Sequence, residues 1–268
     1  MRFFLTNPHF HTFIPDDIAG RINPEANLIN MQEVGIEEII DWPGVAVVNA
    51  EIHQAVINLN RARNDIHPLT GIPYPPQLKL FPEEDFSGAP IFREGESLSD
   101  DEKEKMLVRY YDPFYAKVRE NVDSGNFDFF IDCHLMNNDE SSYTDMQDDE
   151  RPDICLGNLG DAAGQLCEGR EYISFDPEVL NDLKRRISAF GYSCELNIPF
   201  SGGNIIQQFG REFPCFLLEI NKKIFMHDDE GGMMKNKLRK LSMDLYNVFV
   251  KNETILNEKS SHPYIHSS

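Results

Sequence analysis

Short runs of apolar, aromatic and β-branched residues alternate along this chain with longer segments whose apolar residues recur every three to four positions. The short runs have the length and composition of β-strands, and the longer segments have the period of helices that bury one face. Because strands that alternate with helices form a sheet covered by those helices, the pattern predicts an α/β fold with a mixed, largely parallel sheet. The predicted strands are Phe3–Asn7, Val45–Asn49, Ala55–Leu59, Phe127–Asp132, Tyr192–Ile198 and Cys215–Ile220.

Three helices are predicted from their periodicity and their start or stop signals. The first begins after Ser99, whose hydroxyl can cap an acidic first turn, and we expect Pro113 to kink it. The second runs from about Pro177 to Phe190, where a glycine follows, and the third runs from about Lys235 to Lys251.

The remaining segments are expected to be loops or a tail. Residues 63–98 are rich in Pro and Gly and have no regular period, so we expect a lid or a wall of a site. Residues 139–150 hold six acids and no base, which is typical of a solvated loop, with calcium binding as the alternative. We expect one domain over residues 1–250 and a flexible tail over 251–268.

The charge balance narrows the classes of partner. The chain has 25 Lys and Arg against 45 Asp and Glu, a formal net charge of −20, which repels nucleic-acid backbones and anionic membranes. Its five cysteines are odd in number and lack CxxC spacing, so a disulfide framework and a zinc knuckle are disfavoured and a cytoplasmic setting is expected. No run reaches the roughly 18 apolar residues of a membrane span, and we expect no signal peptide.

Polar residues follow several of these apolar runs. They are His9, the pair Asn60 and Arg61, His134 and Glu219. Because the carboxyl ends of parallel strands meet at the edge of the sheet where α/β proteins bind ligands, these side chains can converge in one crevice. Two imidazoles and a carboxylate give zinc three ligands and leave a fourth position for water, and a further carboxylate can take the water's proton.

Neighbouring residues modify this hypothesis. Asp132 lies two positions before His134 on the same strand face, so we expect it to orient that imidazole through its second nitrogen. Cys133 then faces the other side of the strand, as a core residue. His11, two residues after His9, is a weaker candidate ligand, and a single histidine at a strand end is more often structural than a ligand.

Seven short segments follow one another in a fixed order: Pro8-His9 with Ile14-Pro15, Val56–Arg61, Thr70-Gly71-Ile72 ahead of Gly88–Phe92, Asp132-Cys133-His134, Arg151–Asn158, Asn197–Gly203, and Leu217–Ile220 running to Ile224–Met226. In this order they resemble the N-formylglutamate amidohydrolase (deformylase) family, over roughly residues 3–250. The family's fold is similar to that of the zinc carboxypeptidases, which is phosphorylase/hydrolase-like.

The resemblance implies a zinc-dependent amidohydrolase with one Zn2+ per chain. His9 and His134 then hold the metal together with a carboxylate, for which Glu33 aligns best; Glu37 and Glu38 are the alternatives because this stretch departs from the family's sequence. The implied substrate is a small anionic or polar amide, an N-formyl or other N-acyl amino acid such as N-formylglutamate, which places the chain in histidine catabolism.

The same resemblance implies the remaining roles. Glu219 is the general base. Asn60 and Arg61 bind a substrate carboxylate, and Arg61 is also expected to be a catalytic residue. Arginine suits this role because its planar fork can bind a carboxylate through two hydrogen bonds. Gly202 and Gly203 belong to the substrate-binding segment.

Four positions depart from the family's pattern. Gln54 and Gln207 replace arginines, Ser201 replaces a basic residue, and Asn58 replaces an aspartate. Fewer cations weaken the expectation of a dianionic substrate, because each charge-assisted pair contributes to binding. Two alternatives therefore stay open: a metal-free ligand-binding protein that keeps the fold, and a metallopeptidase similar to the zinc carboxypeptidases. The acyl group, the amino acid and the oligomeric state are left open.

Overall fold

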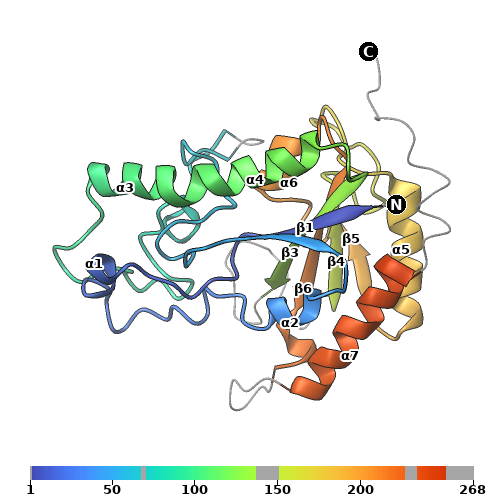
Figure 1. Cartoon of the computed structure of the whole chain (residues 1–268), viewed down its shortest axis with the longest axis horizontal. Helices are drawn as coiled ribbons and strands as arrows, with labels where there is room; N and C mark the ends of the chain where they lie inside the picture. Colours follow the sequence, from blue (N-terminus) through green and yellow to red (C-terminus); the bar gives the residue numbers. More distant parts are fainter. Residues whose placement is uncertain (1, 68–70, 137–150, 227–233, 252–268) are drawn as a thin grey trace. The chain divides into compact units, whose positions relative to one another are not determined.

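The computed structural model describes residues 2–67, 71–136, 151–226 and 234–251 (Figure 1). Its six strands form one sheet in the order β2-β1-β3-β6-β4-β5. The strands are β1 (Phe3–Asn7), β2 (Ala46–Asn49), β3 (Phe129–Met136), β4 (Ile154–Gly157), β5 (Cys194–Leu196) and β6 (Cys215–Asn221). β3 runs parallel to β6 and β4 parallel to β5, whereas β4 is antiparallel to β6. The predicted mixed, largely parallel sheet flanked by helices is confirmed.

The chain divides into two compact units, which we describe separately. The first comprises Met1–Leu5, Gly35–Ala46 and Ser124–Ser268, and the second comprises Thr6–Val34 and Val47–Asp123. The expectation of a single domain over 1–250 stays a prediction. The acidic segment 139–150, with its calcium alternative, and the tail from residue 252 lie outside the described residues.

In the first unit, helices cover both faces of strands β3 and β6. Successive residues of a strand point to opposite faces, so Phe129 and Phe216 face one side and Phe130 and Cys215 face the other. The helices are α2 (Ile36–Ile40), α5 (Pro177–Ala189), α6 (Asn204–Phe209), the 3-10 turn η4 (Lys222–Ile224) and α7 (Lys235–Tyr246), which continues as the π-helix η5 (Asn247–Lys251). Figure 1 shows α5 and α7 on the same side of the strands.

Aromatic rings mark the two faces. Phe216 packs against Phe129 and against Phe249 of η5, which places the first face beneath α7 and its extension. On the second face, Phe130 packs edge-on against Phe209 of α6, at a centroid distance of 6.0 Å. The second face therefore carries the even-numbered residues of β3, and α6 covers part of it.

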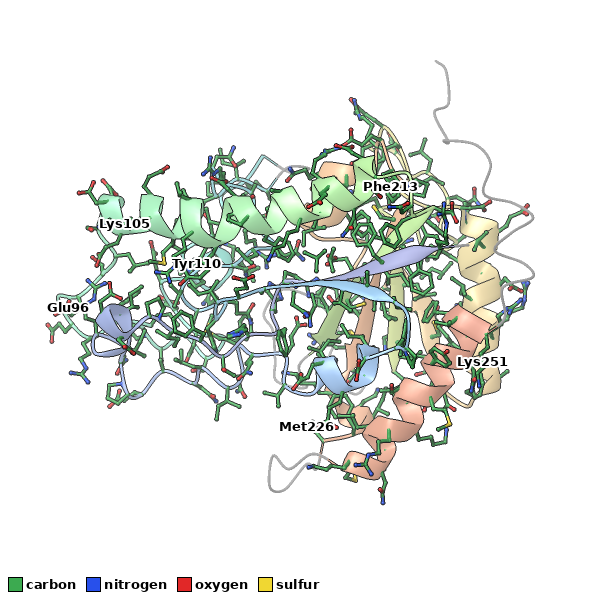
Figure 2. The ribbon with its side chains drawn as sticks, viewed as in Figure 1. Glu96, Lys105, Tyr110, Phe213, Met226 and Lys251 are labelled. Atoms are coloured by element: carbon green, nitrogen blue, oxygen red, sulfur yellow. The ribbon has the colours of Figure 1, made fainter. Side chains whose placement is uncertain are left out.

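The second unit consists of short helices and long irregular segments around a small apolar core. The helices are α1 (Asp16–Ala19), the 3-10 turn η1 (Pro76–Leu78), α3 (Asp100–Met106), the π-helix η2 (Leu107–Tyr111) and α4 (Asp112–Asp123). The core contains Met31, Ala55 and Ile91. Within η2, Tyr110 is buried, whereas Lys105 of α3 is exposed (Figure 2).

The predicted start of α3 is confirmed in atomic detail. Ser99 Oγ accepts from the Glu102 N–H at 3.3 Å, and the Ser99 N–H donates to Glu102 Oε2 at 2.8 Å, which forms a capping box. Pro113 was expected to kink the helix. In the structure it lies in the first turn of α4, directly after the π-helical segment η2. A proline has no N–H and its ring clashes with the carbonyl four residues earlier, here that of Arg109 inside η2.

Several sequence expectations need correction. Ala55–Leu59 is not a strand: the Val56 N–H donates to His53 O at 3.0 Å in a turn, and the Asn58 N–H donates to Leu80 O, in a distant irregular segment, at 2.7 Å. A short apolar run with no alternation can be buried on all sides without pairing in a sheet. β3 also runs on to Met136, so His134 lies within the strand and not after it, whereas Glu219 lies within β6 (Cys215–Asn221) as it does within the predicted strand. Strand β4 was not predicted.

His53 anchors the irregular segment that follows β2. Its N–H donates to Phe13 O at 2.8 Å, and its Nδ1 accepts from the Ala55 N–H at 3.0 Å. Burial lowers the pKa of this histidine from 6.5 to about 4, against a hydrogen bond to the Leu28 backbone that raises it. His53 is therefore neutral near pH 7.

Among the described helices, none has the length and apolar character needed to cross a membrane.

We expect Ser99→Ala to lower the free energy of unfolding by about 1 kcal/mol, because the substitution removes the acceptor at the start of α3. Ser188→Ala, at an exposed position of α5, is the matched control and should change it by less than about 0.5 kcal/mol. Urea unfolding measures both. Equal effects of the two substitutions would contradict the stabilising role of the cap.

We expect His53→Asn to reduce the acid sensitivity of folding. A histidine whose pKa is lowered on folding binds its proton better in the unfolded chain, so stability is lost as the pH falls from 6.5 towards 4. Between pH 7 and pH 5 this amounts to about 2 kcal/mol. Urea unfolding at the two pH values should show a smaller drop for the variant, even if its stability at pH 7 is lower. An equal drop in both proteins would contradict this account.

Candidate metal centre

His9 follows the buried strand β1 and makes two side-chain contacts. Its Nδ1 lies 2.9 Å from Glu33 Oε1, and its Nε2 lies 2.8 Å from Asn58 Oδ1. The backbone joins the same two segments, since the Glu33 N–H donates to His9 O at 3.4 Å. The imidazole is therefore held between a carboxylate and an amide.

The hydrogen bonds of Asn58 determine which nitrogen of His9 carries the proton. Asn58 Oδ1 also accepts from the backbone N–H of Asn60 at 3.0 Å, and a backbone N–H only donates, so this atom is the amide oxygen. His9 Nε2 must then be the donor to Asn58. In a neutral ring the lone pair lies on Nδ1, facing a carboxylate oxygen of Glu33. Two lone pairs at this distance call for a cation between them, either a metal ion or a proton.

His134 shows the same arrangement on strand β3. Its Nε2 lies 3.1 Å from Oδ2 of Asp132, which is fully buried. The predicted orienting role of Asp132 matches this contact. With Nε2 as donor to the carboxylate, Nδ1 is the nitrogen left to bind a metal. Cys133 is buried on the opposite face of the strand, as expected.

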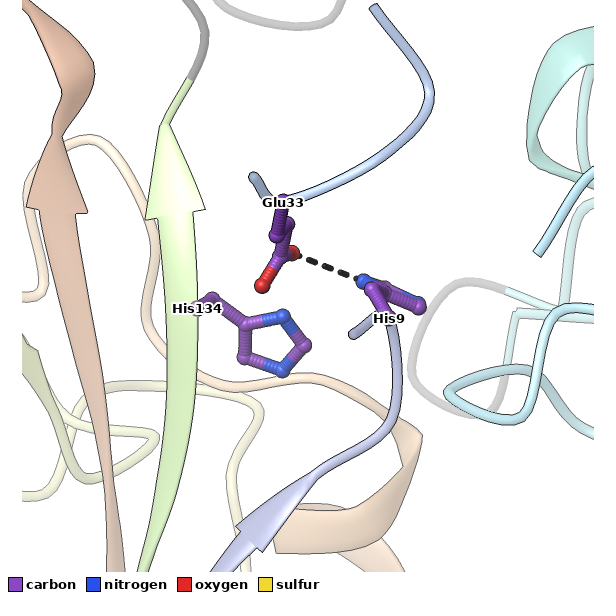
Figure 3. A group of neighbouring side chains, drawn as sticks. All are labelled: His9, Glu33 and His134. Carbon is purple, nitrogen blue, oxygen red and sulfur yellow. Dashed lines mark hydrogen bonds and ion pairs between the residues drawn. The ribbon is translucent and has the colours of Figure 1, made fainter. Parts of the chain in front are cut away.

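His9, Glu33 and His134 form one group. Their ligand atoms all lie within 4.8 Å of one another, and the three residues are 8%, 6% and 3% exposed. Figure 3 shows a ring nitrogen of each histidine on the side of the Glu33 carboxylate. Two imidazole nitrogens and one carboxylate oxygen are the donor set of catalytic zinc sites that keep one position open. The residues present therefore fit a zinc ion.

The other candidate ligands lie outside this group. Glu37 and Glu38 are exposed in the first turn of α2. His11 accepts from the Phe13 N–H through Nδ1 at 2.9 Å and does not belong to the group found among the described residues. The proximity of Glu33 to His9 is thus the feature that separates it from its alternatives.

Glu219 lies beside His134 in the sheet. The two residues are register partners in the parallel pair β3 and β6, and Cys155 of β4 is the partner of Glu219 on its other side. Register partners project from the same face, so the three residues form a row across the sheet. Glu219 is the one partly exposed residue of the otherwise buried strand β6. Burial, with the negative charge of Glu219 adding to it, raises the pKa of the Cys155 thiol above its usual range.

Asn60 and Arg61 lie in the irregular segment that Asn58 begins. The Arg61 guanidinium donates to Leu78 O from Nε at 2.7 Å and to Asn60 O from Nη1 at 2.8 Å. It also lies over the Tyr74 ring, 5.1 Å from the centroid. Two backbone carbonyls and an aromatic face thus fix the orientation of the guanidinium.

Gly202 and Gly203 stand at the start of α6, on the face of the sheet that carries His134. Gly202 has a φ of +145°, and a Cβ there would lie 2.8 Å from Leu159 Cδ2, so the turn itself requires glycine. Gly157, at the end of β4, leaves similar room for the backbone of Ser201, whose carbonyl oxygen would be 2.7 Å from an added Cβ. The segment at Gly202 therefore packs closely on the end of β4.

Sequence reasoning missed one contact in this centre. Asn58 was noted only as a departure from a family pattern, whereas in the structure its oxygen is the partner of His9 Nε2. Its position two residues before Asn60 gave no signal of this, because the contact joins residues 49 positions apart.

Comparisons with known proteins identify the family of this chain. Residues 1–226 match the family model of N-formylglutamate amidohydrolase. The N-formylglutamate deformylase of Pseudomonas putida is 27% identical over 237 residues, which is 84% of this chain and 82% of that protein. The protein of the same name from Pseudomonas aeruginosa is 26% identical over 215 residues, 77% of this chain and 74% of its own length.

A solved structure shares the fold. The crystal structure of N-formylglutamate amidohydrolase from Ralstonia eutropha JMP134 superposes with a TM-score of 0.69 at 20% identity and covers 92% of each chain. At this identity the likeness concerns the fold alone.

Proposed function

Because the chain belongs to the N-formylglutamate amidohydrolase family, we propose that it is a zinc-dependent deformylase that hydrolyses N-formylglutamate to formate and glutamate. It is a hydrolase of amide C–N bonds. The observation that supports zinc most directly is the group of His9, Glu33 and His134, with both histidines anchored through Nε2. This reaction is the one expected of the family in histidine catabolism.

The metal is assigned to His9 Nδ1, His134 Nδ1 and the Glu33 carboxylate. A zinc ion bound there supplies a water of lowered pKa and polarises the carbonyl oxygen of the amide. Asn58 and Asp132 hold the two imidazoles in the tautomer that leaves Nδ1 unprotonated.

Glu219 is assigned as the general base. It accepts a proton from the attacking water, whose oxygen bonds to the formyl carbon, and passes the proton to the amine nitrogen as the C–N bond breaks. Asn60 and Arg61 receive the α-carboxylate of the substrate. Gly202 and Gly203 belong to the chain segment that binds the substrate. The products are formate and a free amino group.

Two further proposals concern the whole chain. We assign it to the cytoplasm, which is supported by the free state of all five cysteines. We also propose that residues 1–250 act as one domain, because the residues assigned to the reaction extend from His9 to Glu219.

We expect His134→Ala to remove bound zinc and to abolish hydrolysis of N-formylglutamate, because it removes one of three metal ligands. His11→Ala is the matched control and should retain both. Metal content by mass spectrometry and release of formate are the measurements. A folded wild-type protein without stoichiometric zinc would favour the metal-free binding protein, and cleavage of peptides at a free C-terminus would favour the peptidase.

We expect Glu219→Gln to lower kcat by about 100-fold or more while zinc content stays the same, because the amide cannot accept the proton. Glu195→Gln in β5, where the carboxylate pairs with Lys184 at 2.6 Å, is the control and should leave kcat within about twofold. Turnover of the variant at the wild-type rate would refute the assignment of the base.

A further inference from the structure

Arg170 has an incompletely satisfied guanidinium. Its Nη2 donates to Ser201 Oγ at 3.4 Å, but its Nη1 is buried and has no hydrogen-bond partner among the residues that the structure describes. Within those residues it also forms no ion pair with a carboxylate, in a chain that has 45 acids. A buried donor on a cation is costly unless something accepts from it, so an acceptor is expected there.

Gln207 of α6 carries a second unsatisfied group. Gln207 Nε2 donates to Gly202 O at 3.3 Å, and its Oε1 is buried without a partner in the described part of the chain. Tyr172 joins the two segments, since its hydroxyl donates to Gln207 O at 2.6 Å. These contacts fix the segments that carry Arg170 and Gln207, but they leave Arg170 Nη1 and Gln207 Oε1 without a hydrogen-bond partner among the described residues.

This place lies on the same face of the sheet as the proposed base. Glu219 is the register partner of Cys155, and the Cys155 Sγ–H donates to Phe200 O at 3.2 Å, directly before Ser201. Neighbouring strands are about 4.8 Å apart, so the row from His134 through Glu219 to Cys155 spans about 10 Å. The contact of Arg170 with Ser201 therefore adjoins the Cys155 end of this row.

We infer that Arg170 determines substrate specificity by binding the second carboxylate of the substrate, the one on its side chain. This inference rests on the proposed function, in which Asn60 and Arg61 receive the α-carboxylate. A side-chain carboxylate extends away from the amide that is cleaved, which matches the offset of Arg170 from Glu219. The carboxylate accepts from Nη1, and a water bound to it donates to Gln207 Oε1.

The first experiment compares three substrates. We expect Arg170→Met to lower kcat/KM for N-formylglutamate by about 10- to 100-fold, mainly through KM, because one charge-assisted hydrogen-bonded pair is lost. N-formylglutamine and N-formylnorvaline, which lack the charge, should change by less than about threefold. Arg211→Met is the matched control: its exposed side chain lies over the Tyr172 ring and pairs with Glu171, and it should leave all three values unchanged.

A rescue variant separates charge from packing. Because Ser201 Oγ lies 3.4 Å from Arg170 Nη2, Ser201→Lys brings a cation to the same place. We expect the double variant Arg170→Met with Ser201→Lys to regain at least about tenfold in kcat/KM for N-formylglutamate. Equal losses for charged and uncharged substrates, or no rescue, would overturn the inference, as would an Arg170-dependent preference for N-formylglutamine.

A binding measurement needs no turnover. Titration calorimetry with glutarate, which has two carboxylates, should show at least about tenfold weaker binding to Arg170→Met than to the wild type, with pentanoate unaffected. If the wild type cleaves no N-formyl amino acid but glutarate binding depends on Arg170, the proposed function is wrong and the carboxylate site stands. If N-formylglutamate is cleaved and Arg170→Met alters neither specificity nor glutarate binding, the function stands and this inference is wrong.

Discussion

The candidate centre depends on two hydrogen bonds that anchor the far nitrogens of its histidines. Asn58 holds Nε2 of His9 at 2.8 Å, and Asp132 holds Nε2 of His134 at 3.1 Å. Each bond turns a lone pair on Nδ1 towards the group that contains Glu33, so three acceptor atoms meet with no donor among them. When the rings are neutral, a metal ion or a proton must lie among these acceptors. The rest of the structure supplies the rigidity, since His134 lies inside a fully buried strand and Asn58 in a segment bonded to Leu80.

The two faces of the sheet have different roles: one packs an aromatic core, and the other carries the candidate site residues. On one face of β3 and β6, Phe129 and Phe216 belong to an aromatic core under α7 and its extension. On the other face, Asp132 and His134 of β3 lie on the same side as Glu219 of β6, the register partner of His134, and α6 covers part of this face. A strand that is polar on one side stays in the sheet because its other side buries large rings.

Part of this was predictable from the sequence. The apolar runs predicted five of the six strands, and the histidines could be proposed as ligands because each stands beside such a run. Glu33 came from the family resemblance, since no period marks it. The turns at Ala55–Leu59 could not be predicted, because burial on all sides has no periodic signature. Arg170 also gave no signal, because its contact with Ser201 joins residues 31 positions apart in an irregular segment.

The amide at position 58 affects the charge count of the centre. Glu33, Asp132 and Glu219 contribute three negative charges when ionised, so a bound divalent cation leaves a sum of −1. Asn58 orients His9 as a carboxylate would, yet it adds no charge; a carboxylate in its place would bring the sum to −2. In a protein of net charge −20, this neutral partner halves the local repulsion that an approaching anion meets.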